Sequence, residues 1–144
     1  MAEFLPSFEF VPEKVKEIII QYGNEALFYK NIPIEHRVYT LLKILNISPS
    51  LKGYTYIKYI LETYTTTNES QYTIPSLSNY VFPKISEIYY STSTKVERTV
   101  RTAIDKCEEE CEPIIFYYFF GNYKKITCSI FLSQLVEFLK LINK

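Results

Sequence analysis

The chain has only three arginines among its 144 residues, and two of them, Arg98 and Arg101, lie three positions apart. Lysine is the usual basic residue elsewhere, with 13 copies. A guanidinium can donate two parallel hydrogen bonds to guanine O6 and N7, a geometry that the flexible lysine ammonium matches less well. Glu97 can accept a hydrogen bond from cytosine N4 or support an arginine. These three side chains therefore have the chemistry to read base edges in DNA.

The residues around this trio suit contacts to the sugar-phosphate backbone. Hydroxyl groups, lysines and the free N–H groups at the start of a helix commonly bind phosphate. We predict backbone contacts from Lys84, Ser93, Thr94, Lys95 and Thr102. The whole chain is neutral, with 16 basic and 16 acidic residues, so DNA binding would depend on the local placement of charge.

The segment 95–110 has the clearest amphipathic pattern in the chain and predicts a helix. At 100° per residue, Arg98 and Arg101 lie opposite an apolar side, so one face packs and the other is exposed. The apolar side consists of Val96, Val100, Ala103, Ile104 and Cys107. For any single helix of mixed charge, a solvated outer face without a partner is the alternative.

A polar turn at 91–94 precedes this helix and offers several N-cap residues. A short helix is predicted before the turn, from Pro83 to about Tyr89. Residues 83–106 therefore have the spacing of a helix-turn-helix whose second helix starts near Ser93. The spacing is only moderately specific, because helical bundles make similar hairpins without binding DNA.

Hydrophobic periodicity predicts the remaining helices, and the fold class is all-α: a compact multi-helix domain with an extra N-terminal helix. The expected segments are 12–29, 34–46, about 50–64, a short one from Pro75, and 127–142. The threonines after Tyr64 and Asn68 predict a loop. The apolar run Ile114–Phe120 fits either a strand or a buried helix, and we interpret it as core packing with a dimer surface as the alternative.

The sequence offers no sign of an enzyme, a metal site or a cofactor site. His36 is the only histidine, and no Ser-His-Asp order or glycine-rich phosphate loop is present. Cys107, Cys111 and Cys128 lack the paired spacing of structural zinc sites, so we expect reduced thiols. No signal peptide or membrane-spanning run is found, so we expect a cytoplasmic protein that does not bind membranes.

Three segments of the chain resemble a known family. They are Lys52–Tyr56, Tyr80–Ile85 and Thr94–Ile104, with V-E-R-x-x-R-x-A-I as the most specific part. Their order and spacing are similar to the C-terminal effector domain of the sporulation initiation response regulator, the stage zero sporulation protein A of spore-forming Firmicutes. The resemblance predicts two regions, a helical extension at 1–33 and an effector domain at 34–144 with the helix-turn-helix at about 83–106.

This resemblance implies a helical domain that binds short asymmetric DNA boxes, often as head-to-tail pairs, and that touches polymerase-bound sigma factor. It places Glu97, Arg98 and Arg101 at the bases, and Thr94 and Lys95 at the backbone. Three features depart from the family. Thr102 replaces the usual histidine, an acidic segment fills 108–112, and the first 33 residues are too short for a phosphoacceptor receiver domain.

We therefore expect a sequence-specific transcription regulator whose partner is double-stranded DNA, with sigma factor and a second copy on DNA as further partners. The alternative is a protein-interaction module or antagonist that pairs with a full-length paralogue or with sigma factor. The acidic segment 108–112 is interpreted as a solvated helix end, with a partner site as its alternative.

Overall fold

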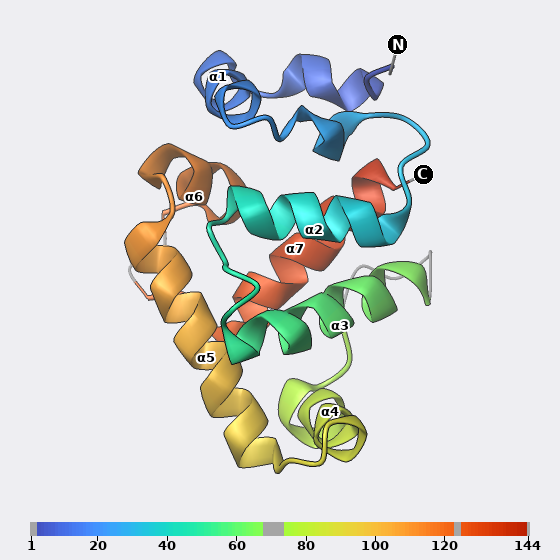
Figure 1. The fold of residues 1–144 in the computed structure, drawn as a ribbon, viewed down its shortest axis with the longest axis vertical. Coiled ribbons are helices and arrows are strands. Elements are labelled where there is room, and N and C mark those ends of the chain that lie inside the picture. The colour runs from blue at the N-terminus through green and yellow to red at the C-terminus, as the bar shows by residue number, and fades with distance from the viewer. Residues whose placement is uncertain (1–2, 68–73, 123–124, 144) are drawn as a thin grey trace.

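The computed structural model describes residues 3–67, 74–122 and 125–143, and Figure 1 shows its fold. Within these residues every regular element is helical, which confirms the all-helical expectation, and the β-type pairing is a single bridge between Phe4 and Tyr29. The α-helices are α1 (Glu13–Gln21), α2 (Ile34–Ile44), α3 (Lys52–Thr66), α4 (Phe82–Ile88), α5 (Ser93–Glu110), α6 (Pro113–Phe120) and α7 (Cys128–Ile142). Two 3-10 helices, η1 (Pro6–Phe10) and η2 (Glu25–Phe28), and a π-helical turn, η3 (Leu77–Val81), complete the set.

The centre of the molecule is the packing of α3 against α5 and α7 (Figure 1). Gly53 in the first turn of α3 permits the close approach to α5. A Cβ at Gly53 would lie 2.7 Å from the Cβ of Ala103 and 2.8 Å from the carbonyl oxygen of Thr99. No side chain fits this space without movement of one helix, so the crossing fixes the position of α5.

The predicted helix-turn-helix is present as α4, a short turn and α5. Tyr90 takes a left-handed conformation with φ of 54°, and the N–H of Ser91 donates to the carbonyl oxygen of Ser86, so α4 ends in a Schellman-type turn. The hydroxyl oxygen of Thr92 then accepts from the N–H of Lys95, 3.2 Å away, and α5 begins at Ser93 as predicted.

The prediction of one continuous helix at 12–29 was wrong. Helix α1 ends at Gln21, and the chain forms η2 after an intervening turn. Gly23 adopts a φ of 70°, and the N–H of Asn24 donates to the carbonyl oxygen of Ile19, 2.8 Å away, in a second Schellman motif. The apolar periodicity continued beyond Gly23, but this glycine carries the helix-ending signal.

The N-terminal segment packs on the rest of the chain and shares its core. Val11, Val15, Ile19, Leu27 and Phe28 are buried in the same hydrophobic cluster as the later helices. Phe28 meets Phe138 of α7 edge-on, with ring centroids 6.0 Å apart. The buried guanidinium of Arg37 in α2 donates to the carbonyl oxygens of Leu27 and Ile32, which ties the segment to α2.

The apolar run at 114–120 is a helix, α6, so the choice between strand and helix is decided. Phe119 and Phe120 are buried, and Phe120 stacks on Phe131 of α7 with centroids 4.6 Å apart. This supports the interpretation as core packing, although Tyr117 on the other side is 63% exposed.

The loop that the sequence predicts after Tyr64 begins later in the structure, because α3 continues to Thr66. Asn68, which is part of the same prediction, lies outside the described residues.

Candidate nucleic-acid interface

The exposed face of α5 is the one that the helical pattern predicted. All five residues of the predicted apolar side are buried, at most 1% exposed. On the opposite face Glu97 and Arg98 are exposed, as are Thr94, Lys95 and Thr102, while Ser93 and Arg101 are partly buried. Figure 1 places the start of α5 and the neighbouring α4 at the end of the molecule farthest from the N-terminal segment.

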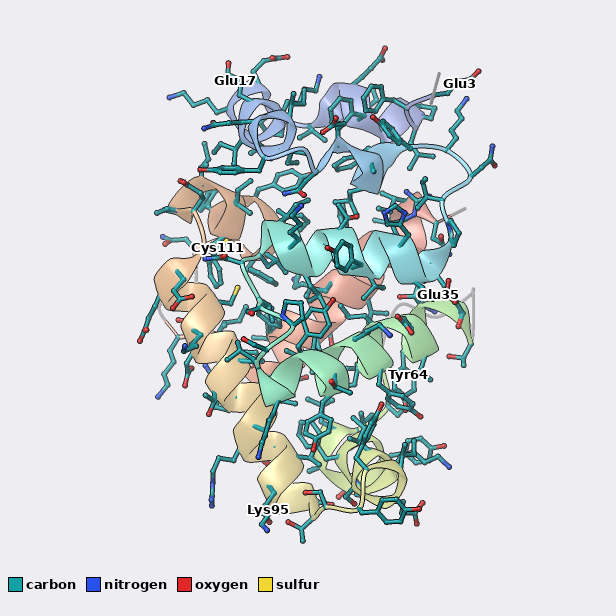
Figure 2. All side chains as sticks on the ribbon, in the orientation of Figure 1. Glu3, Glu17, Glu35, Tyr64, Lys95 and Cys111 are labelled. Atoms are coloured by element: carbon teal, nitrogen blue, oxygen red, sulfur yellow. The ribbon has the colours of Figure 1, made fainter. Side chains whose placement is uncertain are left out.

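The first turn of α5 has several groups that can bind an anion. Because Thr92 satisfies only the N–H of Lys95, the N–H groups of Ser93 and Thr94 lack acceptors in the helix. Figure 2 shows Lys95 at the same tip of α5, projecting from the bundle. The exposed N–H groups, two hydroxyls and an ammonium therefore lie within one helical turn, where the helix dipole is positive.

Arg98 has a free guanidinium. It is exposed, and it has no side-chain hydrogen bond or ion pair within the described part of the chain. Its backbone carbonyl oxygen accepts from the hydroxyl of Thr102, 3.0 Å away. Arg98 can therefore meet an external acceptor without breaking an internal bond, whereas Thr102 must release Arg98 before it can donate to phosphate.

Arg101 differs from Arg98 because its guanidinium is bonded within the protein. Its Nε and Nη2 donate to Asp105 at 2.9 and 2.7 Å, and its Nη1 donates to the carbonyl oxygen of Ile126 at 2.6 Å. A longer ion pair joins it to Glu108 at 3.5 Å. The hydrogen bond to Asp105 holds the pKa of Arg101 above its ordinary value.

These bonds give Arg101 a structural role that the sequence did not suggest. Arg101 clamps α5 to the segment that precedes α7, and its side chain is only 27% exposed. The prediction that Arg101 faces bases thus requires the bonds to Asp105 and Ile126 to open. Asp105 at the i+4 position was visible in the sequence as an ion-pair partner. The carbonyl of Ile126 was not, because it comes from the packing of distant segments.

Lys84 lies exposed in the first turn of α4 and has no ion-pair partner among the described residues. Lys125, which the sequence reasoning missed, lines a shallow hollow of about 600 Å³ together with Glu97, Arg101 and the start of α7. The only sequence signal for Lys125 is its place just before Thr127, the N-cap of α7. The hollow therefore connects the exposed face of α5 with the start of α7.

The three cysteines are the remaining reactive groups, and Cys128 lines the hollow beside Arg101. Cys107, Cys111 and Cys128 carry free thiols, and a hydrogen bond to Cys111, with burial, raises the pKa of Cys107. Within the described residues no group of three or more His, Cys, Asp or Glu side chains is arranged to hold a metal ion. No described helix has the length and apolar character needed to cross a membrane.

The comparison with protein families decides the identity. A family model described as the C-terminal domain of the sporulation initiation factor Spo0A matches residues 38–139. The chain belongs to this family. A comparison with curated protein sequences found no match.

Membership in the Spo0A C-terminal family makes the chain a helical DNA-binding domain of a sporulation transcription regulator. The family is one of regulatory DNA-binding domains and not of enzymes. The matched range contains α3 to α6, the whole helix-turn-helix and every residue of the candidate interface. Residues 3–33, which include α1, lie before the match.

Proposed function

We propose that the chain is a sequence-specific transcription regulator whose helix α5 enters the major groove of double-stranded DNA. The observation that carries this proposal is the free guanidinium of Arg98 beside Glu97, on the exposed face of an N-capped second helix of a helix-turn-helix. In this motif the N-terminal part of the second helix meets the base edges. Arg98 then donates to guanine, and Glu97 accepts from cytosine.

The backbone contacts follow from the first turn of α5 and from α4. Ser93 and Thr94 offer N–H and O–H donors to one phosphate, and Lys95 lies beside them. Lys84 reaches the backbone from the start of α4. Thr102 contributes only after it gives up its bond to the Arg98 carbonyl oxygen.

In this proposal Arg101 must change its hydrogen-bond partner before it contacts a base. In the free protein it is held by Asp105 and Ile126, and in the complex it exchanges Asp105 for a base. The exchange replaces one charged acceptor by polar acceptors on guanine, so it proceeds only where guanine is correctly placed. The internal bond to Asp105 thereby increases the discrimination between DNA sites that offer guanine at this position and sites that do not.

The experiment is a fluorescence-anisotropy titration of the purified chain against a duplex with the sporulation regulator's box and against a scrambled duplex, at near-physiological salt. Preferential binding to the box is expected. Equal affinity for both duplexes, or no binding to either, contradicts the proposal.

A protein-interaction role is the second candidate, and pairing with sigma factor or with another copy belongs to it. The observation in its favour is the exposed ring of Tyr117 on α6, next to the acidic end of α5. Salt separates the two functions, because DNA binding through phosphates weakens steeply as salt rises and an apolar protein contact does not.

A further inference from the structure

A cleft of about 310 Å³ lies between α1, the end of α2 and the end of α5. In Figure 1 these three segments meet on the left of the view, near α6 and away from α4. The apolar side of the cleft consists of Ile18, Ile19 and Ile44, and its polar side includes Asn24, Glu110 and Glu112. The volume is at the lower end of the roughly 300–1,000 Å³ that small-molecule sites occupy.

The cleft is assembled from two parts of the chain. Ile18, Ile19 and Asn24 precede the family match, which begins at residue 38, whereas the glutamates lie inside it. The side-chain amide of Asn46 donates to the carbonyl oxygen of Glu110, 3.3 Å away, and so joins the end of α2 to the end of α5. The site therefore exists only when the N-terminal segment is docked.

Asn24 is the buried polar residue of this cleft, and its side chain has no bonding partner among the described residues. It is 5% exposed, and its backbone N–H and carbonyl oxygen are bonded to Ile19 and Leu27. Its side chain does not cap η2 and makes no hydrogen bond within the described residues. The amide atoms of Asn24 are not among the fully buried unbonded atoms, so they are open to water or to a ligand that enters the cleft.

The carboxylates of Glu110 and Glu112 give the cleft a negative charge. Both are exposed, and neither has an ion-pair partner in the part of the chain that the structure describes. Helix α5 has no basic residue in its last turn, so the negative end of its dipole is not compensated. A cation is therefore the favoured occupant.

We propose that this cleft binds the primary ammonium group of a small aliphatic amine. An ammonium has three N–H donors, and the two carboxylates with the side-chain oxygen of Asn24 are three acceptors. The alkyl chain of such a ligand packs on the isoleucine side. The proposal is independent of DNA binding, because the cleft lies at the opposite end of α5 from the candidate interface.

The test is an NMR titration of the ¹⁵N-labelled full chain, without DNA, with pentylammonium chloride as the probe and 1-pentanol as the neutral control. Saturable shifts at the Asn24 side-chain amide with the ammonium, and none with the alcohol, are expected. Equal responses to both probes, or an ammonium response that does not saturate, overturn the proposal.

The matched variants separate a built site from general attraction. Glu110→Gln with Glu112→Gln should weaken pentylammonium binding about tenfold or more, because two charge-assisted bonds are lost. Glu17→Gln with Glu109→Gln removes the same charge from exposed positions outside the cleft and should leave affinity nearly unchanged. Equal losses in the two variants overturn the proposal.

A further arm identifies the source of the amine. Spermidine and capped lysine, Nα-acetyl-lysine methylamide, present the same ammonium on different carriers. Tighter binding of pentylammonium or spermidine supports a free amine. Tighter binding of capped lysine overturns that assignment in favour of a lysine side chain on a partner protein.

Discussion

The two ends of α5 have opposite charge and opposite surroundings. At the N-terminal end, Lys95 and Arg98 are exposed on a tip formed by α4 and α5. At the C-terminal end, Glu109 and Glu110 are exposed where α5 meets α6 and the N-terminal segment. The 18 residues between the ends span about 27 Å, so each end meets its own partners.

Both ends oppose the helix dipole. A helix is stabilised by acidic residues in its first turn and basic residues in its last turn, whereas α5 has neither. Thr92 caps the start through Lys95, but it adds no negative charge. This arrangement lowers helix stability at both ends, so binding explains it better than folding does. Under the two proposals, phosphate completes the first end and a cation completes the second.

The largest effect is expected from Arg98→Ala, which removes the proposed base-reading group at the N-terminal end. Loss of one bidentate contact should cost about 1–3 kcal/mol on the box duplex and little on the scrambled duplex. Anisotropy titrations of both duplexes measure this. Lys14→Ala, an exposed lysine at the far end of the molecule, is the control for lost charge. Equal losses on the two duplexes would contradict base reading by Arg98.

Gly53→Ala tests the middle of α5, where stability and not binding should respond. The new Cβ would lie 2.7 Å from that of Ala103, so the crossing of α3 and α5 must open. Overpacking of this kind costs roughly 1–3 kcal/mol, measured as the free energy of unfolding in urea. The ratio of box to scrambled affinity should be retained. An unchanged stability would show that α5 is not fixed at this crossing.

The sequence predicted α5 better than its surroundings, and the reason is the range of the interactions. The start near Ser93 and the buried face through Val96 follow from local pattern and capping. The bond from Arg101 to the Ile126 carbonyl spans 25 residues, and the cleft that Asn24 lines is formed by residues of α1, α2 and α5 that are distant in sequence. Neither feature leaves a periodic signal. The end of α1 at Gln21 did have a signal in the sequence, which is the glycine at position 23. The apolar pattern continued beyond this glycine and concealed the signal.

Lys95→Ala should weaken binding to every duplex equally, because the proposed contact of this lysine is to phosphate, which carries no sequence information. The slope of log affinity against log salt should become shallower by about one unit. Titrations at several salt concentrations provide the slope. If the box duplex alone loses affinity, Lys95 contacts a base and the N-terminal end must be reassigned.

Asp105→Asn tests whether Arg101 exchanges its internal partner for a base. The partly exposed ion pair with Asp105 is worth about 0.2–1 kcal/mol, so its loss should strengthen box binding on the order of 1.4–5-fold. Glu87→Gln, an exposed acid on α4, removes the same charge without freeing an arginine. An equal gain in Glu87→Gln, or a loss of box affinity in Asp105→Asn, means that Arg101 serves only to hold α5.

The smallest effect is expected from Glu109→Lys at the C-terminal end. This exposed residue lies outside the amine cleft, so the change places a basic group near the end of the dipole without altering the lining. The free energy of unfolding should rise by about 0.3–1 kcal/mol at low salt and by less at high salt, since the interaction is screened. Box affinity should change little, because the residue is about 16 Å along the helix from Arg98. A decrease in stability would mean that the acidic end is already compensated in the free protein, and the contrast between the two ends would then lie in their partners alone.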